Sequence, residues 1–187
     1  MEKGKTGSVK MPNNFDTDSM GAMVSKLMRI ETQSAVDYAS KNYKQKLYFA
    51  GPWFDNRALL LYEACQRIAK DVEPDSRYSI YYPKDEVNET PIDAFNKNVA
   101  RIADCDALVA LVSRKDVGTA WEIGMAYALG KPVYLLGYDY TTFLSHTNVM
   151  LAFTGKCFTV SKFAKFLVKG LDSDDYVQIS NEWEGIE

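Results

Sequence analysis

Apolar runs alternate along the chain with segments in which apolar side chains recur at helical spacing. Runs typical of β-strands lie at residues 46–51, 77–83, 106–112, 132–138 and 156–160. Segments with a helical period lie at residues 56–71, 91–105, 119–131 and 161–170. Pro91, in the first turn of one helical segment, and Gly130, at the end of another, are typical helix boundaries.

This order predicts an α/β protein with one parallel five-stranded sheet. Right-handed crossovers between consecutive strands place helices on both faces of such a sheet. Apart from Asp106 at its start, the run at 106–112 is continuously apolar, as is the run at 132–138, which is expected for strands buried on both sides. Ligands bind at the carboxyl ends of the strands, where this chain has Gly51–Asp55, Tyr82–Asn88 and Ser113–Gly118.

Residues 1–45 precede the alternating pattern and are predicted to extend the domain at 46–187. Residues 1–18 are polar, so we expect them to be disordered or peripheral. From Ser19 to Tyr43, apolar residues, several of them methionines, recur at helical spacing. We interpret this segment as a helix whose apolar stripe is a packing face or a subunit contact.

The composition fits one domain and excludes several classes of function. The 187 residues are 47% hydrophobic and carry a formal net charge of −3, which suits a single core. The sequence lacks the basic stripe with interleaved aromatic residues that would indicate binding to a nucleic-acid polymer. No apolar run is long enough for a bilayer, and the first residues lack an apolar signal core. We therefore expect a cytoplasmic protein with no membrane partner.

Sulfur and imidazole groups give no sign of a metal site. Cys65, Cys105 and Cys157 are far apart and form no CxxC pair, so neither a disulfide framework nor a metal knuckle is expected. His146, the single histidine, is predicted to be a loop residue. We expect no metal and no cofactor.

The segment from Asp116 to Glu122 contains the strongest candidate for chemistry. Gly118 is predicted to allow a sharp turn into a helix that Thr119 caps, with Glu122 at its third position. One interpretation is a capping box between Thr119 and Glu122, which would be purely structural. The other is a nucleophile, kept ionised by the positive end of the helix and held by the Tyr48 hydroxyl.

Three stretches together resemble the nucleoside 2-deoxyribosyltransferase family: LYFAGPWF, NVARIADCDALVALV and DVGTAWEIGMAYALGKPV. The resemblance covers about residues 46–160. It implies a single flavodoxin-like domain and a double displacement, in which a glutamate takes 2-deoxyribose from one base and passes it to another. The implied ligands are a deoxynucleoside and a free nucleobase.

The resemblance also implies roles for individual residues. Glu122 matches the family's nucleophile, Tyr48 the tyrosine that orients it, and Asp116 an aspartate that handles the base. The candidate substrate-binding residues are Gly51, Trp53, Phe54, Glu86, Asn88, Asn98, Gly118, Asn148 and Met150. Trp53 and Phe54 match the aromatic pair of the base pocket. Asn148, with Met150 beside it, matches an asparagine that reaches the sugar 5′-hydroxyl of a neighbouring subunit, which implies a homo-oligomer with shared sites.

The sequence departs from the family pattern at two places near the base. Asn98 stands where the family has an aspartate, and an amide does not donate a proton as a carboxylic acid does. Protonation of the leaving base would then fall to Asp116 or to water, unless Asp93 substitutes one turn earlier. The family's base-reading glutamine is absent, and Glu86 and Asn88 are both candidates for its role.

Three functions remain open from the sequence. The first is deoxyribosyl transfer. The second is hydrolysis of a deoxynucleoside or its 5′-monophosphate, and Asn148 suits a neutral 5′-hydroxyl better than a phosphate. The third is a catalytically degenerate nucleotide-binding module, which Asn98 favours.

Overall fold

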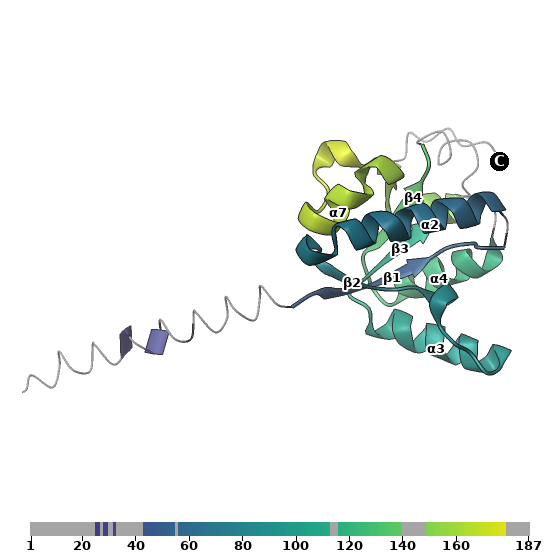
Figure 1. The fold of residues 1–187 in the computed structure, drawn as a ribbon, viewed down its shortest axis with the longest axis horizontal. Helices are drawn as coiled ribbons and strands as arrows, with labels where there is room; N and C mark the ends of the chain where they lie inside the picture. The colour runs from purple at the N-terminus through teal and green to yellow at the C-terminus, as the bar shows by residue number, and fades with distance from the viewer. Residues whose placement is uncertain are drawn as a thin grey trace, which may run out of the picture. The chain divides into compact units, whose positions relative to one another are not determined.

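The computed structural model describes residues 43–54, 56–112, 116–139 and 149–178, together with residues 25, 26, 28, 29 and 32 (Figure 1). The chain divides into two compact units, residues 1–43 and residues 44–187. In the first unit, residues 25, 26, 28, 29 and 32 have helical backbone, and the Thr32 hydroxyl donates to the Met28 carbonyl at 2.7 Å. The predictions for residues 1–18 and for the rest of the helix at 19–43 lie outside the described residues.

Strands and helices of the second unit follow one another largely as the sequence predicts. The strands are β1 (Gln45–Ala50), β2 (Tyr78–Tyr81), β3 (Ala107–Leu111), β4 (Val133–Gly137) and β5 (Lys156–Thr159). The helices are α2 (Asn56–Asp71), α3 (Pro91–Asp104), α4 (Val117–Ala128), α6 (Val149–Ala152) and α7 (Phe163–Lys169). Short 3-10 turns are η1 (Glu73–Asp75), η2 (Pro83–Asp85), η3 (Val160–Lys162) and η4 (Ser173–Asp175).

The five strands form one parallel sheet in the order β2-β1-β3-β4-β5. The prediction of a parallel five-stranded α/β sheet is therefore confirmed. The strand order reverses at β1, which lies between β2 and β3, and ligands of such sheets bind where the order reverses. Tyr48 of β1 lies beside Tyr81 of β2 and Leu108 of β3 in the register.

Side chains of β1 alternate between two cores, one on each face of the sheet. Leu47 and Phe49 join the core that α2 and α7 cover, whereas Tyr48 and Ala50 join the core under α3 and α4 (Figure 1). This alternation follows from the two-residue period of a strand. The Tyr48 side chain therefore lies on the face of the sheet that α3 and α4 cover.

The three cysteines are core residues of the sheet domain. Cys65, Cys105 and Cys157 are free and buried, and burial raises the pKa of the Cys65 and Cys157 thiols to about 12. No helix within the described ranges is long and apolar enough to cross a bilayer.

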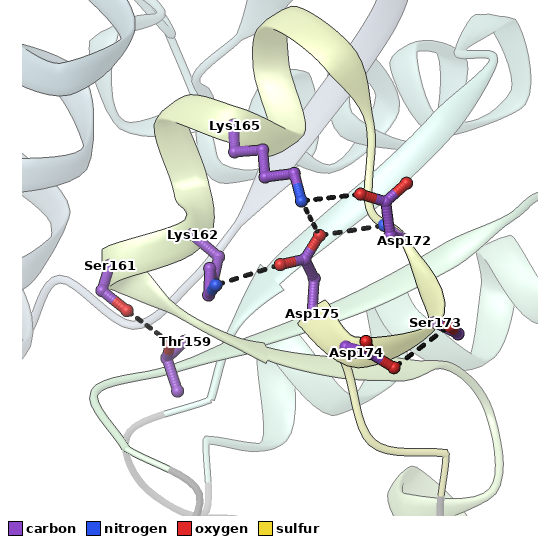
Figure 2. Close-up of polar contacts among 8 residues, drawn as sticks. All are labelled: Thr159, Ser161, Lys162, Lys165, Asp172, Ser173, Asp174 and Asp175. Atoms are coloured by element: carbon purple, nitrogen blue, oxygen red, sulfur yellow. Dashed lines mark hydrogen bonds and ion pairs between the residues drawn. The ribbon is translucent and has the colours of Figure 1, made fainter.

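A buried carboxylate fastens the segment that follows α7, a feature that the sequence did not suggest. Figure 2 shows Asp175 between Lys162, at 3.0 Å, and Lys165, which also pairs with Asp172 at 2.8 Å. The backbone N–H of Asp172 donates to Asp175 Oδ2 at 2.9 Å. The hydrogen bonds from Lys165, the Asp172 backbone and Lys162 hold the pKa of Asp175 well below its usual range. Beyond this cluster, Val177 pairs antiparallel with Cys157 of β5.

We expect Asp175→Asn to lower the Tm by several degrees, because it removes the charge that two lysines face at a buried position. Differential scanning calorimetry measures the change. Asp174→Asn is the matched control, since Asp174 is exposed and accepts only from Ser173 among the contacts drawn in Figure 2. Equal Tm values for the two variants would contradict an anchoring role for Asp175.

Candidate active site

A buried hydrogen bond joins Tyr48 of β1 to Glu122 of α4. The Tyr48 hydroxyl donates to Glu122 Oε1 at 2.6 Å, although the residues are 74 positions apart. Tyr48 is fully buried and Glu122 is 9% exposed. Oε2 of Glu122 makes no hydrogen bond with any residue in the described ranges. The carboxylate is therefore held through one oxygen, and the second oxygen remains for a ligand.

Burial gives Glu122 a pKa close to neutrality. Its pKa is raised to about 7. Desolvation is the largest cause, the Tyr48 hydrogen bond lowers the pKa, and the charge of Asp116 makes a smaller contribution that raises it. The sequence-based expectation that Glu122 lies in the first turn, where the helix end keeps it ionised, is wrong, because burial raises its pKa instead. α4 begins at Val117, so Glu122 lies in the second turn, beyond the reach of the unpaired N–H groups.

Tyr48 stays protonated as the donor in this pair. Burial, followed by the charge of Glu122 and the hydrogen bond to it, holds the pKa of Tyr48 far above its usual range. A protonated phenol donates one hydrogen, which goes to Glu122.

Asp116, rather than Thr119, is the N-cap of α4. Asp116 Oδ2 accepts from the Thr119 backbone N–H and from the Thr119 hydroxyl, both at 2.7 Å. The predicted Thr119 cap and its capping box with Glu122 are therefore wrong. Helices favour aspartate at this position because its short side chain reaches the free N–H groups.

Gly118 has a different role from the sharp turn that was predicted. It lies inside the first turn of α4 and its φ is not positive. A Cβ added there would lie 3.3 Å from Asp116 Oδ2. The absence of a side chain thus leaves room for the capping carboxylate.

Tyr81 and Arg101 extend the site in a way that the sequence analysis missed. The Tyr81 ring centre lies 5.5 Å from that of Tyr48, and the Arg101 guanidinium lies 4.9 Å from the Tyr81 ring centre. Burial and the nearby Glu86 carboxylate raise the pKa of Tyr81, and Arg101 opposes them. The tyrosine-rich end of the second predicted strand was the available signal, because the register places it beside Tyr48.

Trp53 and Phe54 follow β1 at the carboxyl edge of the sheet, and Trp53 packs against the core that α2 and α7 cover. Their predicted role in a base pocket stays a prediction. Trp53 contacts Phe54 and Tyr62, each at 5.8 Å between ring centres, and Phe54 is 80% exposed. Close packing against β3 explains the glycine at position 51, since a Cβ there would lie 3.1 Å from Leu111 Cβ.

The remaining candidates lie on three other segments. Asn88 donates to the Glu86 carbonyl at 3.1 Å, in the loop after β2. Asn98 is half-buried on α3, one turn before Arg101, and Met150 of α6 is 75% exposed. Asn148 and His146 lie outside the described residues.

The nucleoside 2-deoxyribosyltransferase family profile matches residues 47–178, which include every strand except the first two residues of β1. The chain belongs to this family. It is thus a nucleoside deoxyribosyltransferase or a related glycosidase, and the family acts on small-molecule nucleosides and nucleobases.

The chain is similar to solved structures of several enzymes. A 2-deoxyribosyltransferase from Bacillus psychrosaccharolyticus is 22% identical with a TM-score of 0.53, over 69% of this chain and 93% of that one. A 2-desoxiribosyltransferase from Leishmania mexicana is 29% identical with a TM-score of 0.44, over 51% and 65%. A CMP N-glycosidase from Clostridium botulinum is 17% identical with a TM-score of 0.45, over 62% and 87%. Only the first supports the fold assignment. A sequence search of curated proteins gave no significant match.

We expect Tyr48→Phe to raise the pKa of Glu122 above about 7, because the variant removes the hydrogen bond that lowers it. NMR titration of carboxyl-labelled glutamate measures the shift. Tyr62→Phe is the control, since Tyr62 lies in the core on the opposite face of the sheet. A Glu122 titration that does not move in Tyr48→Phe would contradict the contact.

Proposed function

We propose that this enzyme transfers 2-deoxyribose between nucleobases by double displacement, with Glu122 as the nucleophile. One observation carries the proposal: Glu122 is buried, oriented through Oε1 by Tyr48, and has Oε2 unengaged by the described residues. Membership of the family supports the reaction class. A carboxylate that meets the anomeric carbon stabilises an oxocarbenium-like transition state and can then form a covalent ester.

In the first displacement, Glu122 Oε2 attacks C1′ and the bond from C1′ to the base nitrogen breaks. The electron pair of that bond leaves with the base, which takes up a proton. Asp116 or a water molecule supplies this proton. Asp116 lies near enough for its charge to raise the pKa of Glu122. Of its two oxygens, Oδ2 is occupied by Thr119.

In the second displacement, a nitrogen of the incoming base attacks C1′ and the ester bond to Glu122 breaks. The carboxylate is restored and the incoming base gives up a proton. Only the ionised form of Glu122 starts the cycle, and its pKa is about 7. Exchange by the free enzyme therefore declines as the pH falls below about 7.

Water competes with the second base for the glycosyl-enzyme, so transfer requires a site that excludes it. We propose a homo-oligomer, at least a dimer, in which Asn148 of a neighbouring subunit reaches the 5′-hydroxyl. The match of the Asn148 segment to the family pattern supports this arrangement.

We expect Glu122→Ala to lower exchange at least about 10³-fold without unfolding the protein, because it removes the covalent step. The assay incubates the full chain with a deoxynucleoside, with and without a second free base. An exchange product indicates a transferase, free base alone a hydrolase, and neither a binding module. Glu63→Ala on α2 is the control. More than about one per cent residual activity in Glu122→Ala would exclude this nucleophile.

Asn98→Asp is expected to maintain or raise the exchange rate, because it restores an acid at the family's aspartate position on α3. The same assay measures it, with Asn96→Asp at an exposed position of α3 as the control. A sharp loss confined to Asn98→Asp would show that the amide has a role of its own.

A further inference from the structure

Among the described residues, the hydroxyls of Tyr62, Tyr81 and Tyr82 are buried and meet no hydrogen-bond partner. A hydroxyl removed from water without a new partner destabilises the fold, and a phenylalanine would fill the same space without this cost. Tyr62 and Tyr82 pack in the core that α2 and α7 cover. Tyr81 packs against the core under α3 and α4, on the face of the sheet that carries the candidate active site.

Tyr81 lies directly beside the pair formed by Tyr48 and Glu122. It is the last residue of β2, and the register places it next to Tyr48 of β1, with 5.5 Å between the ring centres. The Tyr48 hydroxyl hydrogen is committed to Glu122 Oε1, at 2.6 Å. The Tyr81 hydroxyl hydrogen is donated to no residue that the structure describes. The site therefore has one phenol that holds the carboxylate and a second whose hydrogen is available to a ligand.

Arg101 strengthens Tyr81 as a donor. The Arg101 guanidinium lies 4.9 Å from the Tyr81 ring centre, and α3 carries it one turn after Asn98. A nearby cation stabilises negative charge on a phenol and so increases the acidity of its hydroxyl. Burial, the largest influence, raises the pKa of Tyr81, so the phenol keeps its hydrogen at neutral pH.

The two acids of α3 do not supply a donor for the base. Asp93, which the sequence left open as a substitute acid, pairs with Lys97 at 2.9 Å. Asp104 pairs with Lys46 at 2.8 Å, at the opposite end of the helix. Hydrogen bonds from these lysines hold the pKa of both carboxyl groups below their usual range, so both are ionised and have no proton to give.

We propose that the Tyr81 hydroxyl donates a hydrogen bond to the leaving base and stabilises the negative charge that develops on it as the bond to C1′ breaks. The inference rests on the proposed function, because it adds a catalytic residue to the same reaction. Such a donor acts more strongly on the transition state than on bound substrate, since the charge on the base grows along the reaction. Tyr81 keeps its hydrogen throughout, and the proton that the base takes up still comes from Asp116 or water.

The first test compares Tyr81→Phe with the matched control Tyr62→Phe in the full chain. Each variant keeps the ring and removes a buried hydroxyl that has no partner, so both are expected to keep or raise the Tm in differential scanning calorimetry. Only Tyr81→Phe is expected to lower kcat for base release, by about tenfold or more, with little change in KM. Equal kinetics in the two variants would overturn the proposal.

Bases that leave without negative charge separate this role from a merely structural one. Deoxyguanosine is compared with 7-methyldeoxyguanosine and deoxycytidine with 3-methyldeoxycytidine, using the pair whose base class the wild type accepts. The methylated bases are cations and leave as neutral molecules. Tyr81→Phe is expected to slow release of the unmethylated base about tenfold or more and of the methylated base less than about twofold, whereas Glu122→Ala slows both. Equal losses within a pair for Tyr81→Phe would overturn the role on the leaving base.

Failure of the underlying function has a separate signature. If the wild type releases base from none of these deoxynucleosides, the proposed reaction is wrong and this inference falls with it. If Glu122→Ala abolishes release while Tyr81→Phe releases every base at the wild-type rate, the reaction stands and the inference alone is wrong.

Discussion

The hydrogen bond between Tyr48 and Glu122 is the interaction on which the site depends. Burying a carboxyl group costs free energy unless its oxygens find partners. Here one oxygen is bonded and the other has no partner within the described ranges, while burial raises the pKa to about 7. A partly satisfied buried group is a poor way to stabilise a fold. The proposed nucleophilic role of Glu122 depends on this second oxygen.

The sheet topology explains why these two residues meet. β1 occupies the position where the strand order reverses, so its carboxyl end borders both the loop after β2 and the segment before α4. The two-residue alternation of β1 directs Tyr48 to the face that α3 and α4 cover. α4 then brings Glu122 to the tyrosine, and α3 brings Arg101 to Tyr81. The site therefore combines residues of two neighbouring strands, β1 and β2, with residues of two crossover helices, α3 and α4.

The sequence predicted what depends on periodicity and missed what depends on competition between side chains. The strands and the main helices follow from hydrophobic spacing and the breaks at Pro91 and Gly130. The start of α4 does not, because Asp116 and Thr119 are both acceptable caps and only the folded chain shows that Asp116 accepts from Thr119. The pKa of Glu122 was misjudged because burial outweighs a helix end that lies more than one turn away. The ion pairs of Lys97 and Asp175 could not be predicted, because they join loop segments to helices and do not follow the spacing of apolar residues.

Asp116 connects the N-cap of α4 with the carboxyl group of Glu122. Its charge is one of the causes that raise the pKa of Glu122. The proposed departure of the base requires one carboxyl group as an anion and a proton donor beside it. Because Asn98 is an amide, the proposed mechanism depends on Asp116 or water for the proton that the leaving base takes up.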